Sequence, residues 1–355
     1  MNRRHFLITS ALAGGAAMLG TLSAGRAAAQ GTPVRGGTLI WGHSETVQNL
    51  DMHQTGTAST SRVMQNVHAS IVTVDENLNV VPNLAESFEV AEDGLTYTFR
   101  LRPGVLFHDG AAMTSADVKY SFERCKDPAT GAVNYEVFNN VASIETPDEL
   151  TVVIRMSQVN APFLSRLAEN GAGVVMPAGS GDQQGTAPLG AGPFRFVRHE
   201  PGSVVELARF DEYWEGPAYL DGVVAREITE NTTRLTGLET GELHMINDIP
   251  ADRVEQVEGE GTLQVVKWFP LNWDFVNLNH AFEPFQDRRV RLAVDLAIDK
   301  EALLQGALWG QGAITASPSY PTSASYNASL QNRPQDFAQA RALLAEAGYQ
   351  PGQLQ

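Results

Sequence analysis

A single apolar run in this chain is long enough to cross a membrane, and it lies at the N-terminus. Residues Phe6 to Gly25 carry no charge, but Gly, Ala, Ser and Thr dilute the run. It is therefore a poor membrane-spanning helix and a good core for a signal peptide. Because no later stretch approaches that length, we expect the rest of the chain to fold as a soluble protein around its own hydrophobic core.

Charged and small residues frame the apolar run. Arg3 and Arg4 precede it, and the Arg26 to Gln30 segment supplies a small-x-small cleavage site. The paired arginines resemble the twin-arginine (Tat) signal of exported folded proteins, and we favour Tat over Sec export. We expect residues 1–29 to be a signal peptide and the product to be periplasmic. The expected mature chain does not start with Cys, so we expect no lipid anchor.

Acidic residues outnumber basic ones. The 355 residues include 25 Lys and Arg against 41 Asp and Glu, for a formal charge of −16. Removing residues 1–29 takes away three arginines and no acid, which leaves 22 basic residues and a charge of −19. A protein that binds nucleic acid needs clustered Lys and Arg to displace counterions. The composition therefore argues against a nucleic-acid partner.

The side chains that usually carry catalysis or metal binding show no recognisable pattern. Cys125 is the only cysteine, so no intramolecular disulfide and no Cys-based metal site can form, and we expect it to be buried and structural. Histidines are scattered, and zinc-protease, phosphate-loop and nucleophile-elbow motifs are absent from the sequence. We expect neither cofactor nor metal, although abundant acids leave a carboxylate-dependent hydrolase open.

Hydrophobic periodicity predicts a mixed α+β protein. The clearest signal is a hairpin in which Phe88–Val90 and Thr96–Arg102 flank Asp93-Gly94, with Tyr97, Phe99 and Leu101 on one face. Other expected strands are Thr38–Trp41, Leu150–Met156, Phe194–Val197, Val204–Arg209, Val223–Ile228 and Met245–Ile249. Expected helices are Arg62–Val72, one opened by Thr114, Thr232–Thr240, one opened by Asp287, and Phe337–Ala347. The Gly-rich stretch from Met176 to Pro193 is the best internal boundary.

Two helix starts allow finer predictions. Thr114 and Asp117 have the spacing of a helix cap with a carboxylate in the first turn. Asp287 is expected to cap the second helix and to pair with Arg291, four residues later. We expect the apolar face of that helix to comprise Val290, Val294, Ala297 and Ile298.

Several segments, in order along the chain, resemble the peptide and nickel class (family 5) of extracytoplasmic solute-binding proteins that serve ABC importers. The longest match is Thr98–Gly110 followed by Thr114–Val118. The other matching segments are Gly36–Leu39, Asn49–His53 with Met52 where the family usually has Pro, Pro82–Phe88, Gly190–Phe194, Leu238–Glu242, Pro284–Ala293 and Ala297–Lys300. Each match is weak alone, but the ordered set is specific. Most of these residues are expected to be structural.

The resemblance implies a periplasmic binding protein-like fold with two lobes built from three domains, a hinge and an interlobe cleft. Domain I would comprise residues 36–74 and 186–270, and domain II residues 75–185. Domain III would start at residue 271 and be incomplete at residue 355, since the family's chains continue beyond this point. The implied ligand contacts are Gln54, Thr55, Gly56 and Thr57, together with Asn272 and Trp273.

The resemblance also implies a function. It favours a monomeric, non-enzymatic carrier that binds a peptide or peptide-sized polar solute and delivers it to ABC permease subunits in the inner membrane. Ligand contacts to both lobes would shift the population towards a closed form. Within the same class the ligand could instead be an oligosaccharide, an opine, glutathione or a chelated metal. The exported hydrolase remains the alternative of another class.

Overall fold

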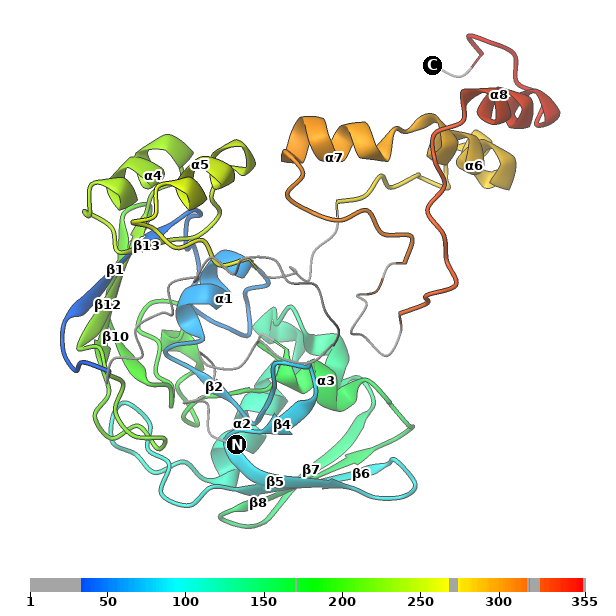
Figure 1. The fold of residues 1–355 in the computed structure, drawn as a ribbon. Helices are drawn as coiled ribbons and strands as arrows, with labels where there is room; N and C mark the ends of the chain where they lie inside the picture. Colours follow the sequence, from blue (N-terminus) through cyan, green and yellow to red (C-terminus); the bar gives the residue numbers. More distant parts are fainter. Residues whose placement is uncertain (1–32, 170, 268–273, 318, 320–325, 354–355) are drawn as a thin grey trace, which may run out of the picture. The chain divides into compact units, whose positions relative to one another are not determined.

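A mixed sheet joins strands from distant parts of the chain (Figure 1). The computed structural model describes residues 33–169, 171–267, 274–317, 319 and 326–353, and the sheet has five strands in the order β10-β11-β12-β1-β13. β1 is parallel to β12 and β13, whereas β10, β11 and β12 pair antiparallel. The strands are β1 Thr38–His43, β10 Phe194–Glu200, β11 Val204–Arg209, β12 Gly222–Glu227 and β13 Met245–Ile246.

A four-stranded antiparallel sheet lies in the middle of the sequence, with the order β5-β6-β8-β7. The predicted hairpin is confirmed, because β5 and β6 pair and the Asp93 carboxylate accepts a hydrogen bond from the Leu95 N–H at 2.8 Å. Tyr97, Phe99 and Leu101 are buried, as the alternation predicts. The strands are β5 Ala85–Val90, β6 Thr96–Leu101, β7 Val141–Asp148 and β8 Thr151–Met156.

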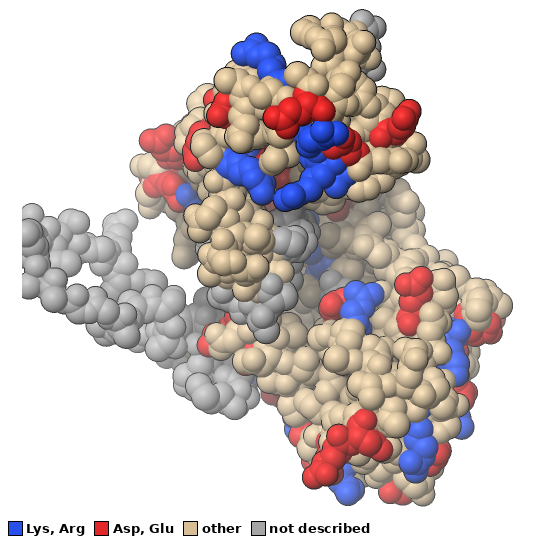
Figure 2. All heavy atoms as spheres, turned by 90° about the vertical axis from the view of Figure 1, so that its right-hand side faces the viewer, with Lys and Arg blue, Asp and Glu red and all other residues tan. Residues whose placement is uncertain are grey.

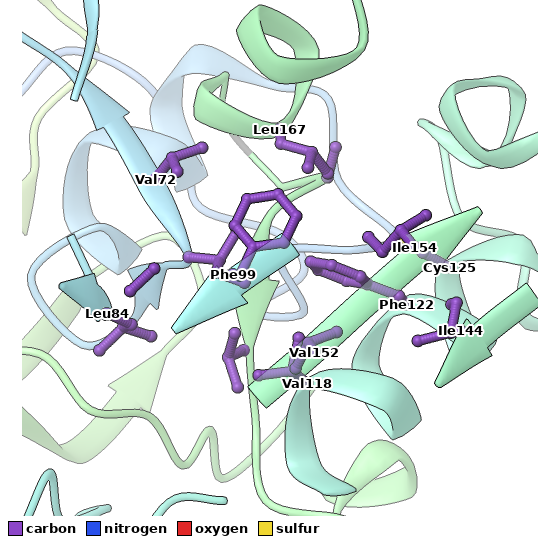
Figure 3. Packing of buried hydrophobic residues seen from close by; sticks show 14 of the residues in the cluster. Val72, Leu84, Phe99, Val118, Phe122, Cys125, Ile144, Val152, Ile154 and Leu167 are labelled. Atoms are coloured by element: carbon purple, nitrogen blue, oxygen red, sulfur yellow. The ribbon is translucent and has the colours of Figure 1, made fainter. Parts of the chain in front are cut away.

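Helix α2 (Ser115–Lys126) and helix α3 (Phe163–Ala168) share one hydrophobic core with this sheet (Figure 3). The predicted helix start is confirmed, because the Asp117 carboxylate accepts hydrogen bonds from the Thr114 N–H at 2.8 Å and from the Thr114 hydroxyl at 2.9 Å. Val118, Phe122 and Cys125 are buried in the core. Burial raises the pKa of the Cys125 thiol to about 12, so it is the expected inert, buried cysteine.

A second hydrophobic cluster packs helix α1 (Ala58–Met64) against the five-stranded sheet. The prediction of a helix over Arg62–Val72 is wrong beyond Met64, because two short strands follow, β2 (Ala69–Ser70) and β3 (Val72–Val74). Val63 and Val67 pack in this second cluster, but Ile71 packs in the first. The apolar spacing therefore serves two cores rather than one helix face. β2 pairs with β9 (Val174–Val175), and β3 pairs with β4 (Val80–Pro82).

The regular secondary structure described in the C-terminal part, residues 274–353, is helical. The Asp287 cap is confirmed, since its carboxylate accepts a hydrogen bond from the Arg289 N–H at 2.8 Å. The predicted Asp287–Arg291 pair is wrong, because Asp287 pairs with Arg289 at 2.6 Å and Arg291 donates to the Phe285 and Gln286 carbonyls. The helices are α6 Arg288–Ala297, α7 Lys300–Leu308 and α8 Phe337–Glu346.

The predicted apolar face of α6 is only partly the buried one, because Val290 is buried as expected whereas Val294, Ala297 and Ile298 are not. The buried residues of the helix are Val290, Ala293 and Leu296, while Ala297 is exposed. Ala293 and Leu296 pack with Ala340 of α8 in a third cluster. The position of α8 therefore selects an i, i+3, i+6 stripe in place of the predicted one.

The remaining helices are short. Helix α4 (Asn231–Glu239) matches the predicted one, and helix α5 (Val254–Gly259) follows it. Single 3₁₀ turns occur at Pro128–Thr130, Tyr135–Phe138, Gly181–Gln183, Ala251–Arg253 and Glu283–Gln286. Among the described residues, no helix combines the length and apolar character that crossing a bilayer requires.

The surface carries charges of both signs. On the face in Figure 2, acidic side chains lie beside basic ones. Exposed pairs include Arg289–Asp287 at 2.6 Å and Arg333–Asp295 at 3.0 Å.

Contacts group Gly36–Gln355 into one unit, so the boundaries of the three domains stay a prediction. The predicted signal peptide, residues 1–29, lies outside the described residues.

Candidate functional site

The carboxyl ends of β1, β12 and β13 meet at one edge of the five-stranded sheet, because these strands are parallel. The chain leaves them at Ser44, Ile228 and Asn247. In sheets of parallel strands, ligands bind preferentially beyond the carboxyl ends, where loops converge. This edge is therefore the first candidate site.

Asp248 is the centre of a polar cluster at this edge. One carboxylate oxygen, Oδ2, accepts hydrogen bonds from the Ser44 hydroxyl at 2.5 Å, from Arg62 Nη1 at 3.1 Å and from Asn247 Nδ2 at 2.5 Å. The Asn247 side-chain oxygen in turn accepts from the Trp41 indole N–H at 3.1 Å. Partial burial opposes ionisation of Asp248, but these hydrogen bonds and the Arg62 charge outweigh it and lower the pKa of Asp248.

The backbone of Asp248 is strained. Its φ is +57°, in the left-handed region that costs a non-glycine residue roughly 1 kcal/mol. The buried guanidinium of Arg234 holds the segment in place by donating to the carbonyl oxygens of Asp248 at 2.8 Å, Asn247 at 3.2 Å and Ile228 at 2.7 Å. Strain maintained by surrounding contacts is a frequent property of ligand-binding positions.

The predicted ligand loop Gln54–Thr57 lies at the N-terminal end of α1, the helix that also carries Arg62. A buried ion pair anchors it, because Asp51 Oδ2 lies 2.6 Å from Arg124 Nη2 of α2. The Asp51 carbonyl accepts hydrogen bonds from the Gln54 and Thr55 N–H groups at 3.1 and 3.0 Å. The loop is therefore fixed from its first residue.

The side chains of this loop are largely engaged with the protein itself. Gln54 donates to the Thr130 carbonyl at 2.9 Å and accepts from Asn49 Nδ2 at 3.2 Å. The hydroxyls of Thr55 and Thr57 lie 3.0 Å apart and form a hydrogen bond. Gly56 is exposed, and its N–H and C=O make no hydrogen bond to other residues in the described parts of the chain. The Gly56 backbone is thus the group that the loop can offer to a ligand.

Two buried histidines, His53 and His68, and the half-buried His108 lie close enough together for His68 to interact with the other two. His53 Nε2 lies 3.2 Å from the Val174 carbonyl, and its Nδ1 lies 3.0 Å from Arg124 Nη1. These distances fit a neutral ring that donates from Nε2 and accepts at Nδ1. Burial lowers the pKa of His53 to about 4 and that of His68 to about 3, and it also lowers the pKa of His108. Both ring nitrogens of His68 lack a partner within the described residues.

The family-like Gly190–Phe194 segment packs against this histidine region. The Gly192 N–H donates to the Val67 carbonyl at 2.9 Å, and the Gly192 carbonyl lies 3.1 Å from His108 Nε2. A Cβ at position 190 would lie 2.2 Å from the Val67 carbonyl oxygen. Position 190 needs glycine because its backbone lies against the backbone of Val67. The role of this glycine is therefore structural.

The sequence located only part of the site. It identified Gln54, Thr55, Gly56 and Thr57, which the structure places together in one loop, although their contact with a ligand stays a prediction. Asn272 and Trp273 lie outside the described residues. The residues it missed are Ser44, Arg62, Asn247 and Asp248. One sequence signal could have indicated this turn. Asn247-Asp248 follows a short strand and lies just before Pro250, and Asn and Asp tolerate the left-handed backbone that tight turns require.

Other parts of the described structure offer weaker candidate sites. Within the described residues, no three His, Cys, Asp or Glu side chains are grouped as metal ligands. An open hollow of about 450 Å³ lies between α4 and α5 and contains none of the predicted ligand residues. Its lining is polar apart from Leu235 and Pro250, and includes Glu230, Glu239, Asp252 and Arg253.

Comparisons with curated proteins and with solved structures both find similarity to binding proteins. The chain is 32% identical over 311 residues to the glutathione-binding protein GsiB of Pectobacterium atrosepticum, covering 86% of this chain and 60% of that protein. It therefore spans about three fifths of the length of such relatives. The periplasmic binding protein DppA of Helicobacter pylori, solved with the peptide STSA, matches with a TM-score of 0.77 and 27% identity, covering 89% of this chain and 67% of that one.

A further structure of the same fold is AgaA of A. tumefaciens R10 in complex with agropinic acid. It matches with a TM-score of 0.75 and 32% identity, over 88% of this chain and 65% of AgaA. These structures confirm the expected mixed α/β, periplasmic binding protein-like fold. The model of the bacterial extracellular solute-binding proteins, family 5 middle region, matches residues 79–355. The chain therefore belongs to the family 5 bacterial extracellular solute-binding proteins.

Proposed function

We propose that this chain belongs to the solute-binding component of an ABC importer, which binds a peptide or a peptide-sized polar solute and delivers it to a membrane permease. The observation that carries the proposal is the polar cluster around Asp248 at the carboxyl ends of three parallel strands. Its side chains are held in place before any ligand arrives, which reduces the entropy cost of binding. The family assignment supports the same function.

The ligands named for similar proteins support a polar solute of this size. They are glutathione for GsiB, the peptide STSA for DppA and agropinic acid for AgaA. Another similar structure, NikZ of Campylobacter jejuni, was solved with Ni(L-His). Opines, glutathione and chelated metals therefore stay open as alternatives to a peptide, and so does an oligosaccharide. The family match does not favour a carboxylate-dependent hydrolase.

The proposed mechanism is a shift between an open and a closed form of two lobes. Gln54–Thr57 and Asn272–Trp273 would contact the ligand, with the Gly56 peptide group forming backbone hydrogen bonds. Moving such an equilibrium from mostly open to mostly closed requires about 5.5 kcal/mol of differential affinity. The permease would recognise the closed form, and the carrier would act in the periplasm as a monomer.

The direct test is to identify the natural ligand. The chain is expressed in its host with its export signal, purified without denaturation, and the small molecules released by acid are identified by mass spectrometry. We expect one class of peptide-sized polar solute in nearly stoichiometric amount. Recovery of products of turnover, or of a bound nucleotide, would contradict the transport function.

A further inference from the structure

We infer that Arg62 and Asp248 together bind a zwitterionic head group of the solute, in which an ammonium and a carboxylate are attached to one carbon. This inference rests on the proposed function, because it names the class of solute that the candidate site selects. The two side chains lie on different elements, Arg62 on α1 and Asp248 after β13, and their charged groups are 3.1 Å apart. Both are accessible, with 34% and 53% of their side chains exposed.

The first step concerns the atoms that the pair leaves available. All the hydrogen bonds to the Asp248 carboxylate reach Oδ2, so Oδ1 has no partner within the described residues. The Arg62 guanidinium uses only Nη1, which leaves Nε and Nη2 without partners there. The pair therefore presents a negatively charged acceptor beside positively charged donors.

The second step concerns charge. A ligand group with one charge would match one member of the pair and meet repulsion from the other. A zwitterionic head group places its ammonium on Asp248 Oδ1 and its carboxylate on the Arg62 donors, so both new hydrogen bonds are charge-assisted. Such bonds also compensate the two side chains for the water that they lose when a ligand covers them.

The third step concerns rigidity. Asp248 is fixed through its side chain by Ser44 and Asn247, and through its backbone by Arg234. Because the left-handed backbone at Asp248 is maintained by these contacts, the carboxylate is held in position before the ligand binds. A preorganised acceptor of this kind distinguishes closely similar ligands better than a mobile surface acid does.

The test uses two isomers that differ only in the position of one peptide bond. γ-Glutamyl-alanine carries an ammonium and a carboxylate on one carbon, whereas α-glutamyl-alanine has the same composition and charge without that group. Calorimetry on the 355-residue chain is expected to show at least tenfold tighter binding of the γ isomer. N-Acetyl-γ-glutamyl-alanine, which lacks the ammonium, is expected to bind as weakly as the α isomer.

Two variants assign the preference to the pair. Asp248→Asn retains a residue that tolerates positive φ, and we expect it to abolish the preference for the γ isomer; Arg62→Gln is expected to do the same. The control is Asp252→Asn, which removes an exposed acid that is not at the strand ends, and it should keep the full preference. Circular dichroism on each variant verifies folding, and Asp248→Gly provides a second way to remove the carboxylate without backbone strain.

The outcomes separate this inference from the function on which it rests. Equal affinity of the wild-type chain for the two isomers, or a full preference in Asp248→Asn, would overturn the inference. A released natural solute without a zwitterionic head group would also overturn it and leave the proposed transport function standing. If no solute is released and none of the three probes binds, both the inference and the proposed function fail.

Discussion

Arg124 of α2 lies 2.6 Å from Asp51, which precedes it by 73 residues; Asp51 is buried and the Arg124 side chain is only 11% exposed. Arg124 also contacts His53 and the Gly181 carbonyl, at 3.0 and 3.3 Å. The pair connects the predicted ligand loop to α2, the helix that packs on the four-stranded antiparallel sheet. The orientation of the loop therefore depends on a residue that no local sequence pattern links to it.

The first prediction concerns this ion pair. Replacing Arg124 with Met leaves the buried Asp51 carboxylate without its partner, so we expect a loss of roughly 3–5 kcal/mol in the free energy of unfolding. Urea denaturation followed by circular dichroism measures the change. Lys119→Met is the control, because Lys119 forms an exposed pair with Glu123 on the same helix and should change stability by less than about 0.5 kcal/mol. Similar losses of stability in Arg124→Met and Lys119→Met would contradict a special role of the Arg124–Asp51 pair in stability.

The second prediction concerns acid. His68 and His53 have pKa values of about 3 and about 4 in the folded chain because they are buried, against about 6.5 when unfolded. Below pH 6.5 the unfolded chain therefore binds protons that the folded chain does not, and the free energy of unfolding falls as pH decreases towards 4. Each histidine contributes up to about 1.4 kcal/mol per pH unit.

The acid dependence can be assigned by substitution. In His68→Leu, no former partner is left unsatisfied, since neither ring nitrogen is bonded within the described residues. Between pH 6 and pH 4, we expect the free energy of unfolding to depend less steeply on pH. The slope should decrease by up to about 1.4 kcal/mol per pH unit, the contribution of one bound proton. His280→Leu, at an exposed position, should leave the slope unchanged. An unchanged slope in His68→Leu would show that this residue does not control acid stability.

The third prediction concerns the backbone contact at Gly190. A methyl group there would lie 2.2 Å from the Val67 carbonyl oxygen, so Gly190→Ala forces the two segments apart and should cost roughly 1–3 kcal/mol. Gly306 lies within α7 with no atom near its missing Cβ, and Gly306→Ala should be neutral or stabilising by up to about 1 kcal/mol. Thermal unfolding gives the melting temperature of each variant. Equal melting temperatures for Gly190→Ala and Gly306→Ala would refute the predicted backbone contact at Gly190.

The fourth prediction concerns the ligand loop. Gly56→Leu places a bulky side chain beside the exposed peptide group. The added Cβ would have the Val133 side chain, at 3.8 Å, as its nearest neighbour, so the protein itself has room for it. We expect the dissociation constant of the released natural solute to rise about tenfold, or about 1.4 kcal/mol, with little change in stability. Gly259→Leu, at an exposed position on α5, should bind normally. Normal binding by Gly56→Leu would remove this loop from the site.

Local patterns predicted the elements whose determinants are close in sequence. The Asp93-Gly94 hairpin, the Thr114–Asp117 helix start and the Asp287 cap each depend on contacts within a few residues, and the structure confirms them. The helix predicted over Arg62–Val72 failed because Ile71 and Val63 belong to different cores. Which of several possible α6 faces is buried depends on α8, about 45 residues later, and periodicity alone does not decide it.

The candidate site divides in the same way. The loop Gln54–Thr57 was identified through the family resemblance, whereas the cluster at Asp248 is assembled from three separate segments. Its left-handed backbone is held by the buried Arg234, and a sequence does not show which arginine is buried. A conformation that depends on tertiary contacts cannot be deduced from the residues beside it.

The position of β1 within its sheet determines the order in which the chain can be assembled. β1 is the only described link between β12 and β13, and its partner β12 begins at Gly222. A chain emerging from the ribosome must therefore keep residues 38–43 unpaired until more than 180 further residues have been made. Pairing over such a separation is slow, and the unpaired strand is exposed to aggregation in the meantime. An export route that waits for folding to finish, which the predicted twin-arginine signal would imply, would suit a chain with this topology.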